Sequence, residues 1–578
     1  MNTLLKPLFT GLLALFVFVV IGLFVASLAI DANRFKPVIE TAAASAGIEL
    51  AIEGDIDWQL LPPGIALNQV RFTLNDKSMA GNADQLAIGI NFKTLASLLN
   101  QSTQLPISNL DVKNSRVLMA IPNSLPLQLS QINLAVNDIN TQGQPFTYDI
   151  DLLAPYSVKV SSSAELSIAL NNQYQPESFS VNNLDLSIND FTINGYIKGS
   201  ESLNKIHGQL SADSFDLIKQ LKVASRFIPE LEVPRMVDPK ALTDIAFESF
   251  FDLTLDGFST IQSTLSLDGQ GIEINSEIDQ NPIKLHTTIS ANQLTLDGYA
   301  SQTDSVAANP ALFAPLAIPM ALWHGQSQIE LNIAEINIGG ASLTNIYGNL
   351  FGNQNIFRLS SLNSDLFDGQ INLSGTLNMQ DSTPSFSVNT SANNIKLIEA
   401  SQFIENIEMG GELNFSFNIS GSGNDGYSAM QSLVGDGLLE IRSPSYQGLN
   451  LEQTLCNAAA LFSGKVPPKK DWPEGTQLDD LTASLSLKGD NLTISEYRTQ
   501  LGNVEFYGSS SLNLSSLRYK LNTIVFAGQE RSSSMGCRVN RMIAKREIPF
   551  RCKGTLGETF NCKPDKSLLE TLLLTPKL

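Results

Sequence analysis

Most of the chain alternates apolar and polar residues, a pattern typical of β-strands with one apolar and one polar face. The segment 50–60 (LAIEGDIDWQL) is a clear case, with apolar residues at Leu50, Ile52, Ile56, Trp58 and Leu60. Such a strand packs one face inward and leaves the other face to solvent. We therefore expect Asp55 and Asp57, on the polar face, to contact solvent and to have no catalytic role.

A short template, apolar-x-apolar-x-Gly, recurs along the sequence. Its glycines are Gly195, Gly257, Gly269, Gly298, Gly375, Gly489 and Gly508. The intervals between the copies vary, which excludes a repeat of fixed period. The template predicts a mainly β fold, a long antiparallel-rich meander of amphipathic strands in which glycine allows turns, bulges or bends. Few short helices are expected.

One segment can cross a membrane as a helix. Residues 8–30 (LFTGLLALFVFVVIGLFVASLAI) carry no charge, and a membrane-spanning helix needs about 20 apolar residues. Lys6 precedes the segment and Ser27-Leu28-Ala29 offers a cleavage site, which also fits a secretory signal. The apolar part of a cleaved signal is shorter, so we predict a retained anchor at 8–30 behind a cytoplasmic stub at 1–7.

A Pro-rich apolar stretch divides the rest of the chain. Residues 309–325 contain Pro310, Pro315 and Pro319, which exclude a regular helix. We predict that this stretch links an N-terminal β-rich region, 31–308, to a C-terminal β-rich region, 326–578. It either covers a core or forms a lid or a loop that touches the membrane.

All four cysteines lie in the last quarter of the chain, at Cys456, Cys537, Cys552 and Cys562. An even set in one region suggests disulfides in an oxidising compartment, and buried thiols are the alternative. Cys552 and Cys562 facing each other across a hairpin would leave Cys456 to pair with Cys537. No zinc site is expected, because the sequence has no CxxC pair and no histidine nearby.

Charge and motifs argue against several classes of function. The net charge of −20 disfavours nucleic acid or an anionic membrane surface as the main partner. His207, His286 and His324 are scattered, and no HExxH, GxSxG or GxxxxGK[ST] motif occurs. The GxGxxG match at 421–426 follows an alternating strand, whereas a dinucleotide site follows a strand apolar on both faces. We therefore expect no enzyme activity, no cofactor and no metal.

Several short motifs keep a fixed order along the chain. After the apolar segment come 31–36 (DANRFK) and 52–58 (IEGDIDW), followed by Pro62 and Leu67. Further motifs lie at 365–377, 435–437, 448–451, 476–481, 508–514, 548–550 and 564–565. In this order they resemble the AsmA family of envelope proteins from Gram-negative bacteria. The region of roughly 100–340 matches only in its strand pattern, and the cysteine cluster around 548–550 is not part of the pattern of every member.

This resemblance implies an inner-membrane, single-pass anchor with a large domain in the periplasm. The wider AsmA-like group looks like bridge-type lipid transporters, in which a curved, taco-like sheet forms a groove with an apolar lining. The family is also associated with outer-membrane protein assembly and with protein targeting to membranes. No catalytic residue carries over.

The groove also follows from packing. A long amphipathic meander with few helices cannot cover its apolar face unless the sheet curls on itself. If the curl is incomplete, the inner face becomes a channel for acyl chains. Its expected lining includes Ile52, Ile56, Trp58, Leu60, Ile371, Leu373, Val504 and Phe506. We thus expect phospholipid binding in support of lipid transport and outer-membrane biogenesis. The alternative is a scaffold that assists outer-membrane protein assembly or targeting through exposed strand edges.

Overall fold

The computed structural model describes residues 31–45, 47–60, 62–90, 107–120, 126–140, 142–170, 176–200, 203–228, 231, 233–299, 326–403, 408–447, 450–462, 466, 469–502, 504–527, 547–555 and 562–564. Three features lie outside these residues: the predicted anchor (8–30), the predicted linker (309–325) and Cys537. The anchor, the linker and the pairing of Cys537 therefore stay predictions. Within the described ranges, no helix is long and apolar enough to cross a membrane.

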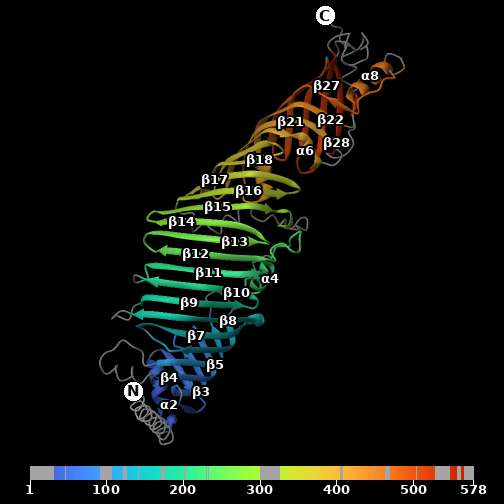
Figure 1. The fold of residues 1–578 in the computed structure, drawn as a ribbon. Helices are drawn as coiled ribbons and strands as arrows, with labels where there is room; N and C mark the ends of the chain where they lie inside the picture. Colours follow the sequence, from blue (N-terminus) through green and yellow to red (C-terminus); the bar gives the residue numbers. More distant parts are fainter. Residues whose placement is uncertain are drawn as a thin grey trace, which may run out of the picture. The chain divides into compact units, whose positions relative to one another are not determined.

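The described residues form two compact units, and each consists mainly of a β-sheet. The N-terminal unit extends to residue 281 without 235–239, and the C-terminal unit comprises 235–239 and the residues from 282 onward. In both units the strands follow one another along the sheet in chain order, as Figure 1 shows by its labels and colours. The prediction of a mainly β, antiparallel fold with few helices is confirmed for these residues.

The N-terminal unit contains fourteen strands and four short helices among its described residues. The strands are β1 Ile48–Ile52, β2 Ile56–Leu60, β3 Pro63–Leu74, β4 Met79–Ile90, β5 Ile107–Met119, β6 Leu127–Asn137, β7 Gln142–Ala154, β8 Val158–Leu170, β9 Pro176–Ile188, β10 Phe191–Ser200, β11 Lys205–Phe215, β12 Ile245–Thr254, β13 Phe258–Leu267 and β14 Gln270–Gln280. The helices are η1 Ala32–Phe35, α2 Lys36–Ser45, η2 Pro155–Ser157 and α4 Leu217–Ala224. β1 and β2 both pair with β3, and each later strand pairs antiparallel with the next.

The C-terminal unit continues with β15 Ile283–Thr295, β16 Gln326–Ile338, β17 Ala341–Asn353, β18 Ile356–Leu366, β19 Gly369–Asn378, β20 Ser385–Lys396, β21 Met409–Ser422, β22 Val434–Gln447, β23 Gly475–Gln477, β24 Leu481–Lys488, β25 Asn491–Leu501, β26 Val504–Asn513, β27 Arg518–Ala527, β28 Glu547–Thr555 and β29 Cys562–Pro564. Its described helices are η3 Asp297–Tyr299, α6 Leu397–Ala400, η5 Ser401–Phe403, α7 Gly426–Ser432 and α8 Leu451–Phe462. The GxGxxG match thus spans the end of β21, a short loop and the first residue of α7, beside an antiparallel strand pair.

One pairing in the C-terminal unit is parallel. β15 and β16 run in the same direction, and Ile289 lies opposite Leu331. A parallel pair needs a crossover of about a dozen residues or more. Residues 296–325 separate the two strands in the sequence, which is long enough. The sequence between β15 and β16 thus has the length that a crossover needs.

Bulges interrupt the pairing at several strands and bend the sheet. The register between β20 and β21 shifts between Ala392 and Ile395, and Asn394 has a left-handed backbone with φ of 57°. The Asn394 N–H, freed from the ladder, donates to Asn414 Oδ1 of β21 at 2.9 Å. In the N-terminal unit the Asn114 N–H likewise donates to an asparagine side chain. Because bulges bend a strand and increase its twist, this device curves each sheet.

The recurring glycines have two different structural roles. Gly195, Gly375 and Gly508 lie inside strands, where an added Cβ would come within 2.0–2.5 Å of a carbonyl oxygen on the neighbouring strand. Gly269 and Gly489 lie in turns with φ of 84° and 59°, a region that favours glycine. The sequence template therefore marks both close strand contacts and strand ends.

We expect Gly375→Ala to destabilise the C-terminal unit by about 1–3 kcal/mol, as overpacking does, because the new Cβ would lie 2.5 Å from the Ser387 carbonyl oxygen. Gly271→Ala in β14 is the control, since nothing lies within 4 Å of its added Cβ. Urea unfolding of both variants measures the difference. Equal destabilisation by the two substitutions would contradict this role of Gly375.

Candidate functional site

The register of the C-terminal unit brings apolar residues onto one face of successive strands. Leu373 of β19 lies opposite Thr390, which lies opposite Phe417. The row continues through Gly437, Leu485 and Ile494 to Ser510. We call the face that carries this row the inner face. Its members include Ile333, Ile346, Leu359, Leu362, Ile371, Leu373, Val388, Phe415, Phe417, Leu485, Ile494, Val504 and Phe506.

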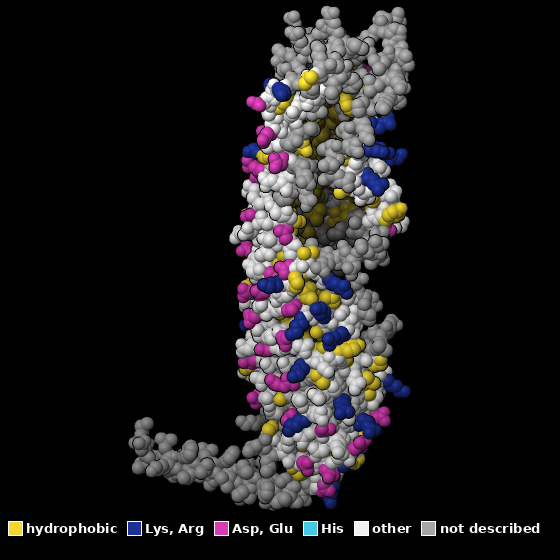
Figure 2. Space-filling view, turned by 90° about the vertical axis from the view of Figure 1, so that its right-hand side faces the viewer, with side chains coloured by type: hydrophobic (Ala, Val, Ile, Leu, Met, Phe, Trp, Pro, Cys, Tyr) yellow, Lys and Arg dark blue, Asp and Glu magenta, His cyan; other side chains and the backbone are white. Residues whose placement is uncertain are grey.

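The middle of the inner face is only partly covered by the protein. Ile371, Leu373, Val388 and Phe415 are half-buried, although each is apolar. Figure 2 shows a hollow in the upper part of the view, at the level of the C-terminal strands of Figure 1, with hydrophobic side chains along it. Contiguous apolar surface that remains open indicates an interaction site.

Helix α8 closes the inner face at its last strands. Cys456 of α8 packs with Val504, Phe506 and Val525 in a buried cluster, and none of the four is more than 8% exposed. Leu455, Trp472, Leu478, Leu501 and Phe550 surround the cluster. The predicted lining residues therefore lie in two environments: Ile371 and Leu373 in the open part, Val504 and Phe506 in the closed part.

Asparagine and threonine side chains hold α8 in this position. Asn450 Oδ1 accepts a hydrogen bond from the Gln453 N–H at 2.6 Å, as an N-cap does. The Asn450 side-chain amide also donates to the Pro473 carbonyl oxygen at 2.8 Å. Thr476 of β23 accepts from the Leu451 N–H at 2.7 Å. The first turn of α8 is thereby fixed to the segment that leads into β23.

The first strands of the N-terminal unit are covered by η1 and α2. Ile52 and Ile56 form a buried cluster with Ala32, Leu67 and Val70. Ile39 of α2 packs against this cluster from outside. Contact of Ile52 and Ile56 with lipid stays a prediction.

Trp58 lies at the margin of this packed end. Its side chain is 37% exposed, and its ring meets the Phe35 ring edge to face, with centroids 6.1 Å apart. The side chain of Leu60 lies outside the described residues. Trp58 thus contacts η1, next to the sequence of the predicted anchor.

Tyr497 is a polar side chain on the inner face. Its hydroxyl hydrogen-bonds the Thr523 hydroxyl of β27. Burial raises the pKa of Tyr497, and the bond to Thr523 opposes this shift. The phenol therefore stays uncharged at neutral pH, and this part of the inner face remains without charge.

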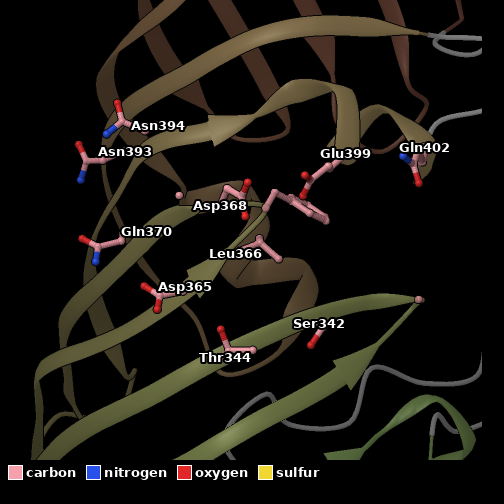
Figure 3. A pocket seen from close by; sticks show the side chains of 13 residues that line it. Ser342, Thr344, Asp365, Leu366, Asp368, Gln370, Asn393, Asn394, Glu399 and Gln402 are labelled. Carbon is pink, nitrogen blue, oxygen red and sulfur yellow. The ribbon is translucent and has the colours of Figure 1, made fainter.

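The opposite face of β17 to β20 carries a hollow whose lining is mostly polar. This hollow of about 790 Å3 is lined by Thr344, Asp365, Gln370, Asn393, Asn394 and Glu399, among others. Figure 3 shows these side chains along β17 to β20 and on α6. Lys396, at the end of β20, pairs with Asp368 of the same lining. Among the described residues, no group of three or more His, Cys, Asp or Glu side chains could hold a metal ion. This polar lining does not suit an acyl chain.

Comparison with known proteins agrees with the motif order. The model of the AsmA family matches residues 1–82 and 299–497. The protein AsmA of Escherichia coli K12 is 21% identical over 543 residues, which cover 87% of this chain and 85% of that protein. Both comparisons support membership of the AsmA family. No solved structure matches it significantly.

The AsmA-like motif before the first strand has a structural role here. Asn33 Oδ1 accepts a hydrogen bond from the Ile56 N–H at 3.0 Å. Glu40 Oε1 of α2 accepts one from the Ile52 N–H at 2.9 Å. These bonds satisfy the outer edge of β1 and β2 and hold η1 and α2 over the first strands.

Three of the four cysteines, Cys456, Cys552 and Cys562, lie among the described residues. No cysteine among the described residues is a free thiol, and Cys456 and Cys552 are both buried. Cys552 of β28 lies opposite Cys562 of β29 in the strand register. Opposite residues of antiparallel strands lie about 4.5–5.5 Å apart, a separation that a disulfide can bridge.

The predicted Cys552–Cys562 and Cys456–Cys537 pairing stays a prediction. We expect non-reducing peptide mapping of the purified protein to yield these two linked peptides. Four alkylated thiols, or a Cys456–Cys552 peptide, would contradict the predicted pairing.

Sequence reasoning missed several residues of the inner face. Phe415 and Phe417 belong to the alternating strand that precedes the GxGxxG match. Their aromatic side chains at i and i+2 were the available signal. Bulges shift the strand register and so decide which residues of the later strands continue the row. Alternation of apolar and polar residues alone does not reveal where bulges occur.

Proposed function

We propose that this AsmA family protein binds phospholipid with its acyl chains on the inner face of the C-terminal unit. The observation that carries the proposal is the row of apolar side chains across β16 to β26, which stays open in its middle. A closed core would cover Leu373 and Phe415, whereas both are half-buried. An acyl chain has the shape and polarity to cover them.

The energetics support an acyl chain as the occupant. Each buried methylene contributes about 0.8 kcal/mol, so partial burial of one chain gives several kcal/mol. The inner face offers such contacts, and the Tyr497 hydroxyl on it is already hydrogen-bonded to Thr523. The polar headgroup would remain at the margin of the face, in contact with water or with polar side chains.

The proposed cellular role follows from the family and the predicted anchor. Residues 8–30 would hold the protein in the bacterial inner membrane, with both units in the periplasm. The inner face would then receive phospholipid close to the membrane and support lipid transport and outer-membrane biogenesis.

Native mass spectrometry of the full chain, extracted in mild detergent, tests the proposal. We expect the protein to carry adducts with the masses of bilayer phospholipids. These adducts should persist when the detergent is removed in the gas phase. A protein free of lipid, with Leu373 and Phe415 protected from surface labelling by its own packing, would contradict the proposal.

A further inference from the structure

Exposed apolar side chains gather along one rim of the C-terminal unit. The rim consists of α7, the β24–β25 turn and the β26–β27 turn, and we call it the α7 rim. Its exposed apolar residues are Tyr427 (66%), Val434 (51%), Leu517 (47%), Leu514 (39%) and Met430 (37%). A single exposed apolar residue is ordinary, but a contiguous group marks an interaction surface.

Backbone hydrogen bonds join the three parts of the rim. The Gly489 N–H of the β24–β25 turn donates to the Leu433 carbonyl oxygen, just after α7, at 2.8 Å. The Leu514 N–H of the β26–β27 turn donates to the Asp490 carbonyl oxygen at 2.8 Å. The exposed side chains thus project from neighbouring turns of one continuous edge.

Basic residues flank these apolar side chains. Lys488 lies opposite Val434, Arg518 follows Leu517 directly, and Lys520 lies opposite Lys553 of β28. All four bases are exposed. Like charges directly opposite on paired strands repel each other, and no ion pair found between described residues involves these four bases. An anionic partner would relieve this repulsion.

The acidic residues of the rim are already hydrogen-bonded. Asp425 Oδ1 accepts from the Ser428 N–H at 2.7 Å, and Asp490 Oδ2 accepts from the Asn513 side chain at 2.7 Å. Beside the rim, a hollow of about 490 Å3 is lined by Lys488, Ser486, Ser420 and Asp436, among others. These neutral donors leave the carboxylates charged, but the four bases outnumber Asp425, Asp490 and Asp436, whereas the whole chain carries a net charge of −20.

The backbone of Leu517 is a further unusual feature. Leu517 adopts φ of 55°, a conformation that is strained for a large side chain. This conformation places an exposed leucine at the tip of a turn, beside Arg518. Glycine would relax the backbone and remove the apolar side chain.

We propose that the α7 rim docks on the headgroup region of an anionic phospholipid bilayer. Aromatic and aliphatic side chains beside Lys and Arg are the composition that enters the membrane interface. The strands that end at the rim also carry the inner face, with Leu487 and Leu512 next to the turns. A lipid could therefore pass from the bilayer to the inner face, and in this respect the inference rests on the proposed function.

Vesicle tethering tests the docking. The full chain is reconstituted in phosphatidylethanolamine vesicles, and labelled acceptor vesicles of phosphatidylethanolamine and phosphatidylglycerol are added. We expect acceptors to be captured, with capture falling about tenfold in Tyr427→Ser/Val434→Ser and in Lys488→Gln/Arg518→Gln/Lys520→Gln. High salt should weaken capture, because the Debye length shrinks to about 3 Å at 1 M. Leu255→Ser/Phe258→Ser is the matched control, since both residues are exposed in the N-terminal unit.

Leu517→Gly separates docking from folding. We expect it to reduce capture severalfold without lowering the melting temperature. Unchanged capture in all rim variants would overturn the docking proposal. Clustering of protein-bearing vesicles in the absence of acceptor vesicles would also overturn it, because the rim would then be a contact between copies of the protein. The phospholipid that each sample retains is measured in parallel. A rim variant that loses capture but retains its lipid supports the docking proposal. A protein that captures vesicles but retains no lipid contradicts only the proposed function.

Discussion

Phe506→Ala is expected to lower the free energy of unfolding of the last strands of the C-terminal unit by about 3–5 kcal/mol. Phe506 is 8% exposed and packs with Cys456, Val504 and Val525. Removal of its ring leaves a cavity between α8 and the sheet. The cavity cannot collapse easily, because the first turn of α8 is fixed by hydrogen bonds. Hydrogen exchange of the β25–β27 amides reports the opening of this region directly.

Phe351→Ala is the matched control for Phe506→Ala. Phe351 lies on β17 of the same unit, and 39% of its side chain is exposed. We expect its loss to change stability by less than about 1 kcal/mol, as at surface positions. If both substitutions had the same effect, or if the amides of β25–β27 exchanged at unchanged rates in Phe506→Ala, the closed end would not be a core.

Leu373→Glu is expected to reduce the phospholipid that co-purifies with the protein by about tenfold or more. A carboxylate on the inner face would have to lose its hydration next to an acyl chain, and burial of an unpaired charge is costly. A tenfold loss corresponds to about 1.4 kcal/mol, well below the cost of full burial. Quantitative lipid extraction from equal amounts of protein measures the change.

Asn372→Glu provides the control, because residue 372 lies on the same strand and on the opposite face. We expect this variant to keep its lipid and both variants to keep their circular dichroism. Equal lipid loss in the two variants would show that Leu373→Glu acts through misfolding. Full lipid retention in Leu373→Glu would place the lipid elsewhere.

The alternation of apolar and polar residues was enough to predict the strands and their two faces. Ile371 and Leu373 share one face of β19, as Val504 and Phe506 share one face of β26, because a strand places every second side chain on the same side. The helix at 451–462 was also predictable, since its apolar residues recur at helical spacing. The likeness to the AsmA family was predictable from the order of the motifs.

The two environments along the inner face were not predictable from the sequence. Val504 and Phe506 are apolar like Leu373, but α8 covers only the former pair. That cover depends on hydrogen bonds of Asn450 and Thr476 to segments distant in the sequence, which a periodic pattern does not contain. The parallel pairing of β15 and β16 was also not predictable, because alternation carries no information on strand direction.

Photo-crosslinking with benzoylphenylalanine at alternate positions of β19 and β21 tests the central claim most directly. The probe is placed in cells at Ile371, Leu373 and Phe415 on the inner face, and at Gln370, Asn372 and Asn414 on the outer face. The proposed lipid-binding face predicts phospholipid adducts at the first three positions and none at the second three. Adducts at both sets alike, or only at the outer positions, would contradict it.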